Sequence, residues 1–292
     1  MEYTFSIIIP HKNSPELLKR CINSIPERDD LQIVIVDDNS DEKIVDFSNF
    51  PGSERKNVKT IFNKQSLGAG HARNLALQLA SGKWLLFADA DDYYINLNTL
   101  LDKYAEINDT DIVYFNCKGE SDTTNRCTKY NQIIDEYISN RTIGEKKIRF
   151  NWWTPWNKMI NRHLIDIHNL KFEEVKSGND AKFCLLAGYF ANKIIVDPDF
   201  FYISTIQSNS ITLRKKTLNE RIETLKVMMK IYNFTVLVGS YDKAYKNNII
   251  SLSVIKDILF QYGIKGAFLY IKQYLKEKKL KTVYSEVNIN NE

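Results

Sequence analysis

Cysteine and histidine are scarce in this sequence, and neither residue type forms a recognisable pattern. The four cysteines among the 292 residues stand at Cys21, Cys117, Cys127 and Cys184. Because none of them is paired in spacing, the sequence indicates neither a zinc site nor a disulfide framework, and it favours a reducing compartment. The four histidines are equally dispersed, so none of them is predicted as a metal ligand.

Long apolar runs are also missing. No run approaches the roughly 20 apolar residues that cross a bilayer. The first residues, MEYTFSIIIPHKN, carry an acid where a secretory signal would carry basic residues, which argues against export. We therefore expect a cytoplasmic protein.

The common nucleotide-binding loops are absent as well. The stretch LGAGHARN (67–74) is rich in glycine before a helical pattern, but Arg73 stands where the last glycine of a Gly-x-Gly-x-x-Gly motif belongs. The Walker spacing is not matched either, which disfavours a P-loop nucleotidase and an ordinary dinucleotide dehydrogenase. A sugar nucleotidyltransferase would be expected to carry a glycine-rich loop after its first strand, and PHKNSPE has no glycine.

The residues that are present divide into two parts by charge. Residues 214–282 hold 15 Lys and Arg against five Asp and Glu, whereas residues 1–213 hold 25 against 29. Only helical patterns follow residue 214. We predict a catalytic domain over 1–213 and a helical extension over 214–292.

The basic extension has two possible roles. Its stretch DILFQYGIKGAFLYIKQYLKEKKLK is a basic amphipathic pattern that can lie on an anionic membrane surface. Alternatively, these helices pack on the catalytic domain and leave a solvated lysine face. No base-reading motif accompanies the charge, so nucleic acid is not an expected partner.

The first 115 residues alternate strand-like and helical patterns. Apolar runs at 5–9, 32–36, 58–62, 84–88 and 111–115 are separated by helical stretches. Such alternation predicts an α/β fold with a mostly parallel sheet flanked by helices. The polar residues 116–131 are expected to form a loop or a ragged edge.

Polar clusters follow three of the predicted strands, at 10–13, 37–40 and 89–92. Ligands bind beyond the carboxyl ends of strands in such sheets, so these clusters are predicted to line one crevice. Carboxylates two residues apart, as in Asp89 and Asp91, suit Mg²⁺ or Mn²⁺ together with the phosphates of a ligand. The alternative is a solvated turn, where aspartate is common.

Six stretches in order resemble the family 2 glycosyltransferases, which invert the anomeric centre and have the GT-A fold. They are FSIIIPHKN, IVIVDDNSDE, NKQSLGAGHARNLAL, WLLFADADDYY, PWNKMI and SGNDAKF. The resemblance covers residues 4–212 and implies transfer of a sugar from a nucleotide-diphosphate donor, with a UDP-sugar favoured, to a saccharide or lipid-linked acceptor. Bacterial surface-polysaccharide synthesis is the expected setting. The chain lacks the membrane spans and the Gln-x-x-Arg-Trp motif of processive synthases, so transfer of one sugar is expected.

The resemblance also implies roles for single residues. Pro10 and Asn13 would line the nucleotide pocket, although Lys12 stands where the family often has an aromatic residue. Asp38 would accept from the base imide N–H, and Arg73 would lie near the base and phosphates. The remaining two donor-site residues are Asp89, facing the ribose, and Asp91, holding the Mn²⁺ or Mg²⁺ ion.

The acceptor side is implied by the last two stretches. Asp180 falls where the family has its general base, with Asn179 in place of the usual Glu; the alternative is a helix N-cap. Further residues that would contact the acceptor or support the site from behind are Asp92, Trp153, Trp156, Lys158 and Asn179. For the tryptophans the alternative is the core, and Lys158 either neutralises phosphate or covers the strand. The competing functions are an inactive nucleotide-sugar-binding relative and a sugar nucleotidyltransferase.

Overall fold

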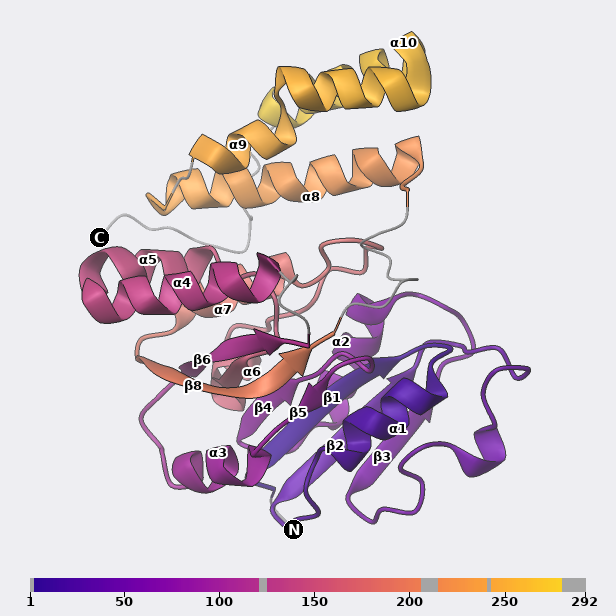
Figure 1. The fold of residues 1–292 in the computed structure, drawn as a ribbon, viewed down its shortest axis with the longest axis vertical. Coiled ribbons are helices and arrows are strands. Elements are labelled where there is room, and N and C mark those ends of the chain that lie inside the picture. The colour runs from indigo at the N-terminus through magenta and orange to yellow at the C-terminus, as the bar shows by residue number, and fades with distance from the viewer. Residues whose placement is uncertain (1–2, 121–124, 206–214, 241–242, 280–292) are drawn as a thin grey trace. The chain divides into compact units, whose positions relative to one another are not determined.

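The computed structural model describes residues 3–120, 125–205, 215–240 and 243–279 (Figure 1). The chain divides into two compact units, which are described separately. The first comprises residues 1–174 and 179–210, and the second comprises residues 175–178 and 211–292. The boundary predicted at 213/214 stays a prediction, and the second unit also contains Val175–Gly178.

The first unit is built on an eight-stranded sheet of order β3-β2-β1-β4-β7-β6-β8-β5. In chain order the strands are β1 (Phe5–His11), β2 (Leu31–Asp37), β3 (Val58–Phe62), β4 (Trp84–Phe87), β5 (Tyr93–Tyr94), β6 (Ile112–Gly119), β7 (Lys158–Asn161) and β8 (Ile194–Ser204). Strands β3, β2, β1 and β4 run parallel, as do β6 and β8. The predicted α/β fold with a mostly parallel sheet is confirmed, and β7 enters antiparallel between β4 and β6.

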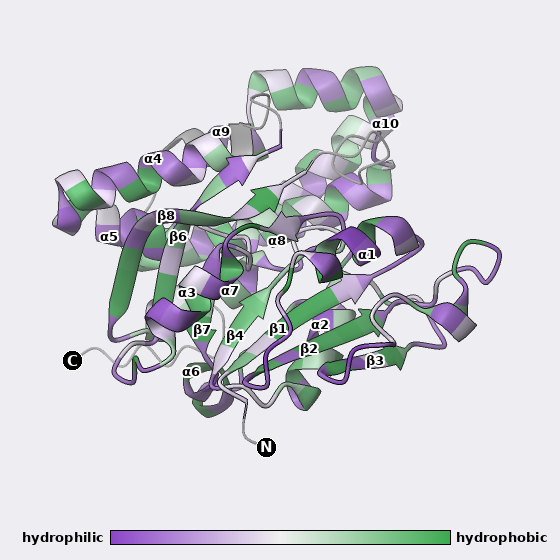
Figure 2. Cartoon of the chain, turned by 60° about the horizontal axis from the view of Figure 1, so that its bottom comes forward, coloured by the Kyte–Doolittle hydropathy of each residue, from purple (hydrophilic) through white to green (hydrophobic). Residues whose placement is uncertain are grey.

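The central strands form because apolar residues fill both of their faces. Every residue of β1 and β2 is buried, and Ile7 of β1 pairs in register with Ile33 of β2 and Leu86 of β4. These strands are mostly hydrophobic along their length in Figure 2. Each such side chain contributes about 1.5–3 kcal/mol when it is fully buried, so the register of these strands is strongly specified.

Seven α-helices are described in the first unit. They are α1 (Pro15–Asn23), α2 (Ala69–Leu79), α3 (Leu97–Tyr104), α4 (Asn125–Ser139), α5 (Arg141–Phe150), α6 (Arg162–Ile167) and α7 (Ala181–Phe190). Helices α1 and α2 lie on opposite faces of the parallel strands (Figures 1 and 2). Pro15 begins α1, and the side chain of Ser14 at the N-cap makes no capping bond.

The expectation of a loop over 116–131 is wrong. Strand β6 continues to Gly119, and α4 begins at Asn125. Helix α4 has an apolar stripe among its polar residues, because Cys127, Tyr130 and Ile134 are buried at a spacing that brings them to one face.

The second unit is helical where it is described, with α8 (Leu218–Leu237), α9 (Lys243–Ile249) and α10 (Leu252–Lys279). Thr217 and Glu220 form a capping box at the start of α8, which satisfies two free backbone N–H groups. Gly263 interrupts α10 with φ 71° and ψ −177°. Within the described ranges, no helix has the length and apolar character needed to cross a membrane.

Candidate active site

Three polar turns meet at one edge of the sheet, because β2, β1 and β4 are parallel neighbours. Backbone bonds connect the turns to the strands beside them. The N–H of Asp38 donates to the carbonyl of His11 at 2.8 Å, and the N–H of Ala88 donates to that of Ile8 at 3.0 Å. Pro10 is buried within β1 just before this edge. The predicted meeting of the three clusters is therefore observed.

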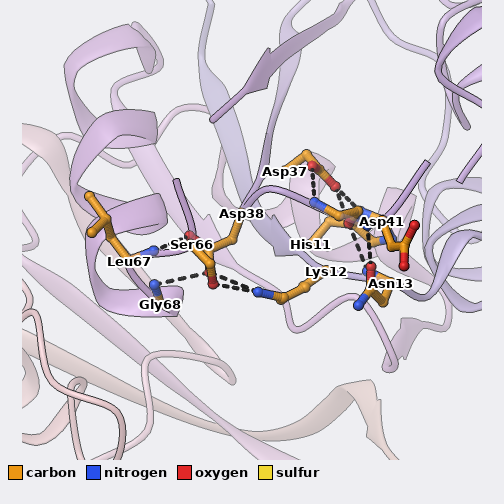
Figure 3. Close-up of polar contacts among 10 residues, drawn as sticks. His11, Lys12, Asn13, Asp37, Asp38, Asp41, Ser66, Leu67 and Gly68 are labelled. Carbon is orange, nitrogen blue, oxygen red and sulfur yellow. Dashed lines mark hydrogen bonds and ion pairs between the residues drawn. The ribbon is translucent and has the colours of Figure 1, made fainter. Parts of the chain in front are cut away.

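The turn after β1 is held by His11, which the sequence did not single out. Its Nδ1 lies 2.8 Å from Oδ2 of Asp37 (Figure 3). Its Nε2 accepts from the N–H of Ser14 at 3.1 Å. Burial opposes ionisation of Asp37, but hydrogen bonds from His11 and Ser40 outweigh it and lower the pKa of this carboxyl.

Asn13 extends the same network. Its N–H donates to Oγ of Ser40 at 2.8 Å, and its Oδ1 accepts from the N–H of Asp41 at 2.8 Å. Its φ of 53° is left-handed, a conformation that asparagine adopts more readily than most residues. The network therefore fixes the side chain of Asn13 at the sheet edge.

Asp38 anchors the loop that leads into α2. Its Oδ1 accepts from the N–H of Leu67 at 2.8 Å, and its Oδ2 accepts from the N–H of Gly68 at 3.0 Å and the hydroxyl of Ser66 at 2.8 Å (Figure 3). The ammonium of Lys12 lies 4.0 Å from the same Oδ2 and also donates to Ser66. Gly68 has φ 92°, which favours glycine at this position.

Arg73 connects the acid cluster to the segment before α7. It is buried, and its guanidinium donates to Oδ1 of Asp89 at 2.6 Å and to Oδ1 of Asn179 at 2.9 Å. The same group lies 5.4 Å from the centre of the Phe172 ring. Gly70 permits this approach, because a Cβ there would lie 2.1 Å from the carbonyl oxygen of Glu173.

The acids after β4 form one compact cluster. Carboxylate oxygens of Asp89, Asp91 and Asp92 lie within 4.8 Å of one another. Asp92 is buried and accepts from the Tyr202 hydroxyl and the Thr205 N–H, each at 2.7 Å. Burial first, and then the charges of Asp89 and Asp91, raise the pKa of Asp92 well above its usual value.

Tyr202 of β8 therefore organises the turn, a role that no sequence pattern signalled. Its hydroxyl also accepts from the N–H of Asp89 at 2.9 Å. The carbonyl of Asp91 accepts from the Thr205 hydroxyl at 2.7 Å and from the Arg20 guanidinium at 2.5 Å. Strand β8 and helix α1 thus hold the turn from two sides.

The donor set of this cluster fits a hard cation. All its ligand atoms are carboxylate oxygens, which Mg²⁺ and Mn²⁺ prefer. Asp92 is satisfied by the protein itself, whereas Asp89 and Asp91 remain partly accessible. One or two carboxylates suit an ion that takes its other oxygens from a ligand and water.

Asp180 stands at the N-terminus of α7, next to Asn179. It occupies the N-cap position with φ −90° and ψ −26°, but its side chain makes no capping bond. Lys158 is a buried residue whose ammonium donates to the carbonyl of Trp152 at 2.8 Å. Burial lowers the pKa of Lys158, and the charge of Asp180 acts in the opposite direction. Lys158 thus lies inside the protein rather than on a phosphate-facing surface.

The tryptophans separate into core and partly exposed residues. Trp156 is 1% exposed and stacks on Tyr202, with ring centres 5.6 Å apart. It belongs to the core, the alternative reading of the sequence, and offers no open face to a sugar. Trp153 is partly exposed, and its indole N–H donates to the carbonyl of Phe150 at 2.7 Å.

The comparisons with known proteins agree with this geometry. A family model described as "Glycosyl transferase family 2" matches residues 6–165, which is more than half of the chain. The chain belongs to glycosyl transferase family 2. The resemblance of the six stretches is thereby confirmed.

Two of the similar proteins are named as poly(ribitol-phosphate) glycosyltransferases. One is the poly(ribitol-phosphate) beta-N-acetylglucosaminyltransferase TarS of Staphylococcus aureus, 25% identical over 256 residues that cover 85% of this chain and 43% of TarS. The other is the poly(ribitol-phosphate) beta-glucosyltransferase of Bacillus spizizenii, 30% identical over 68% of this chain and 31% of that protein. The chain spans less than half the length of each.

Solved structures confirm the GT-A fold expected for a member of family 2. Residues 1–349 of TarS in complex with UDP-GlcNAc superpose with a TM-score of 0.64 at 21% identity, covering 94% of this chain and 79% of that one. A mannosyltransferase of Pyrobaculum calidifontis in complex with GDP-Man and Mn²⁺ gives a TM-score of 0.54 at 15% identity, covering 97% and 77%. At these identities the likeness concerns the fold.

Proposed function

We propose that this protein is an inverting glycosyltransferase that moves one sugar from a nucleotide-diphosphate donor to a hydroxyl of a saccharide or lipid-linked acceptor. One observation carries the assignment of the site. The Arg73 guanidinium bonds both Asp89 of the acid cluster and Asn179, the neighbour of Asp180. Groups suited to a donor diphosphate and to acceptor activation, far apart in the sequence, are thus held side by side.

The donor occupies the carboxyl edge of β1, β2 and β4. Pro10 and Asn13 line the nucleotide pocket, Asp38 accepts from the base imide, and Asp89 faces the ribose, with Arg73 beside it. A UDP-sugar is favoured, since the TarS structure of the same fold contains UDP-GlcNAc. Asp91 would hold Mn²⁺ or Mg²⁺, and such an ion would neutralise the charge that grows on the leaving diphosphate.

Asp180 is the general base in this proposal. It takes the proton of the acceptor hydroxyl while that oxygen bonds to the anomeric carbon. The bond from this carbon to the diphosphate oxygen breaks on the opposite face, and its electron pair leaves with the nucleoside diphosphate. A single displacement of this kind inverts the anomeric configuration. Asn179 keeps Arg73 in place beside the base, and Lys158 supports the segment from behind.

The acceptor belongs to bacterial surface-polysaccharide synthesis. Support comes from the two relatives named poly(ribitol-phosphate) transferases. Such an acceptor is a saccharide or a lipid-linked saccharide, so we place the protein in the cytoplasm, at the inner face of the membrane. Peripheral contact through the basic C-terminal helices would bring it to that surface.

The first test measures thermal unfolding with UDP, GDP and dTDP, each with and without Mn²⁺, for the wild type and Asp91→Asn. A ligand at 100 times its Kd stabilises a fold by about 2.7 kcal/mol, which raises Tm by about 4 °C for a chain of this size. We expect a Mn²⁺-dependent rise with UDP that Asp91→Asn abolishes. The absence of a rise with every nucleotide would contradict the proposed donor site.

Turnover measurements distinguish an active transferase from an inactive nucleotide-sugar-binding relative. The second alternative arises because Asn179 replaces the usual Glu of the family. Release of UDP in the presence of acceptor, lost in Asp180→Asn with nucleotide binding intact, supports catalysis. Nucleotide binding without sugar transfer would assign the protein to nucleotide-sugar binding alone. The sugar nucleotidyltransferase alternative is set aside, since the chain belongs to family 2.

A further inference from the structure

Helix α10 presents an apolar stripe on its outer side. Ile264, Phe268, Ile271 and Leu275 are all exposed, and Ile264 and Phe268 are 82% and 64% exposed. They recur at intervals of four, three and four residues. At 100° per residue, these positions fall within about 60° of the helix circumference. Such a row of large apolar side chains marks an interaction surface.

A different face of α10 does the packing within the helical unit. Gly266, Ala267 and Tyr270 are buried, and the Tyr270 hydroxyl donates to the carbonyl of Ile249 at 3.0 Å. A Cβ added at Gly266 would lie 3.6 Å from Leu218 of α8, so the two helices approach closely there. These contacts fix the rotation of α10, and the apolar stripe faces outward as a result.

Lysines line one side of the stripe. Four lysines on this side are exposed and have no ion-pair partner among the residues described. They are Lys265, Lys272, Lys276 and Lys279. On the same helical projection they lie about 60–120° from Ile264, next to the stripe. Phe268 and Leu275 also border an open hollow of about 760 Å³ that Ile222 of α8 helps to line, so the apolar surface extends beyond one helix.

Charge identifies the partner that suits this face. Helix α10 has six lysines against two acids, and one of the acids, Asp257, is paired with Arg221 at 2.7 Å. A second copy would bring its own lysines to the interface, where like charges repel. Anionic lipid headgroups would neutralise the lysines, while the stripe enters the boundary between headgroups and acyl chains.

We propose that α10 docks on an anionic membrane surface through Ile264, Phe268, Ile271 and Leu275, with the four lysines on lipid phosphates. This inference deepens the membrane contact in the proposed function and rests on that function only for its biological purpose. The docked helix would hold the protein where a lipid-linked acceptor is found.

Co-sedimentation of the full chain with vesicles tests the proposal. We compare phosphatidylcholine vesicles containing phosphatidylglycerol with vesicles of phosphatidylcholine alone. The wild type is expected to bind the anionic vesicles, and 0.5 M NaCl should weaken binding because salt screens the lysines. Equal binding to both compositions, or none to either, would overturn the proposal.

Paired variants separate the two contributions. I264S/F268S should lower the affinity for anionic vesicles about tenfold or more, whereas Ile138→Ser, at another exposed isoleucine, should not. K272E/K276E should also lower the affinity for anionic vesicles. K56E/K59E makes an identical change in net charge at exposed residues elsewhere and should leave binding nearly unchanged. If the stripe variants bind like the wild type, the inference is wrong.

Two further measurements complete the test. A lipid-free dimer that I264S/F268S abolishes, seen by analytical ultracentrifugation, would assign the stripe to a second copy and contradict membrane docking. The Mn²⁺-dependent nucleotide shift in Tm is measured on the same variants. If the variants keep this shift in Tm but lose vesicle binding, the result supports the docking role of α10. If the wild type shows no shift in Tm, the result counts against the proposed donor site and not against membrane docking.

Discussion

Two aspartate pairs in this protein have the same sequence and opposite surroundings. Asp37 ends β2 and Asp38 follows it, whereas Asp91 and Asp92 lie in the turn after β4, which β1 separates from β2 in the sheet. The first pair accepts from His11 and Ser40 on one carboxyl and from the loop at 66–68 on the other. These hydrogen bonds use the negative charge of the first pair to hold the surrounding turns in place.

The second pair, Asp91 and Asp92, belongs to a cluster of negative charge. With Asp89 it places three carboxylates within 4.8 Å of one another, and the pKa of Asp92 rises. In this group Asp92 accepts from Tyr202 and Thr205, and Asp89 accepts from Arg73. The comparison shows that an Asp–Asp dipeptide says little about function until the donors around it are known.

The largest expected effect is on turnover at the second pair. Asp91→Asn removes charge from the proposed cation site, and we expect sugar transfer to fall about 10²–10³-fold. Its free energy of unfolding should stay the same or increase, because one of three clustered like charges is gone. Steady-state kinetics and urea unfolding measure the two quantities, with Asp41→Asn as an exposed control. Near-normal turnover would contradict the distinction between the pairs.

The next effect is on stability at the first pair. Asp38→Ala leaves the N–H groups of Leu67 and Gly68 and the Ser66 hydroxyl without their acceptor, so the free energy of unfolding should fall by about 1–3 kcal/mol. Urea unfolding is the measurement. The matched control is Asp46→Ala, whose exposed side chain accepts from the N–H and hydroxyl of the nearby Ser48, and a much smaller loss is expected there. Equal losses would show that Asp38 is no anchor.

The smallest effect is a pH dependence at Asp37. Burial opposes it, but hydrogen bonds from His11 and Ser40 lower the pKa of Asp37 in the folded protein. The stability it contributes is therefore present above the unfolded pKa of about 4 and is lost as the pH falls through the folded pKa. Asp37→Asn should show a flatter decline in urea midpoint below pH 4 than the wild type. Superimposable profiles would sink this explanation.

Local sequence patterns predicted much of the sheet and of the site. The runs at 5–9, 32–36, 58–62 and 84–88 became adjacent parallel strands; β1, β2 and β4 bury both faces, whereas β3 at the sheet edge is partly exposed. The polar residues after them reached one edge because parallel strands end together. The helix α4 was missed, as its buried residues are separated by polar ones, and the antiparallel β7 carries no local signature of its direction.

What the sequence by itself determined is the family, the alternation of strands and helices, and the edge at which the acids gather, because these depend on side chains near one another in the chain. Only the tertiary structure decided which acids are paired and which are crowded. His11, Arg73 and Tyr202 make that difference through partners 26, 106 and 110 residues away. Chain folding brings such partners together, and hydrogen bonds between distant side chains leave no local pattern.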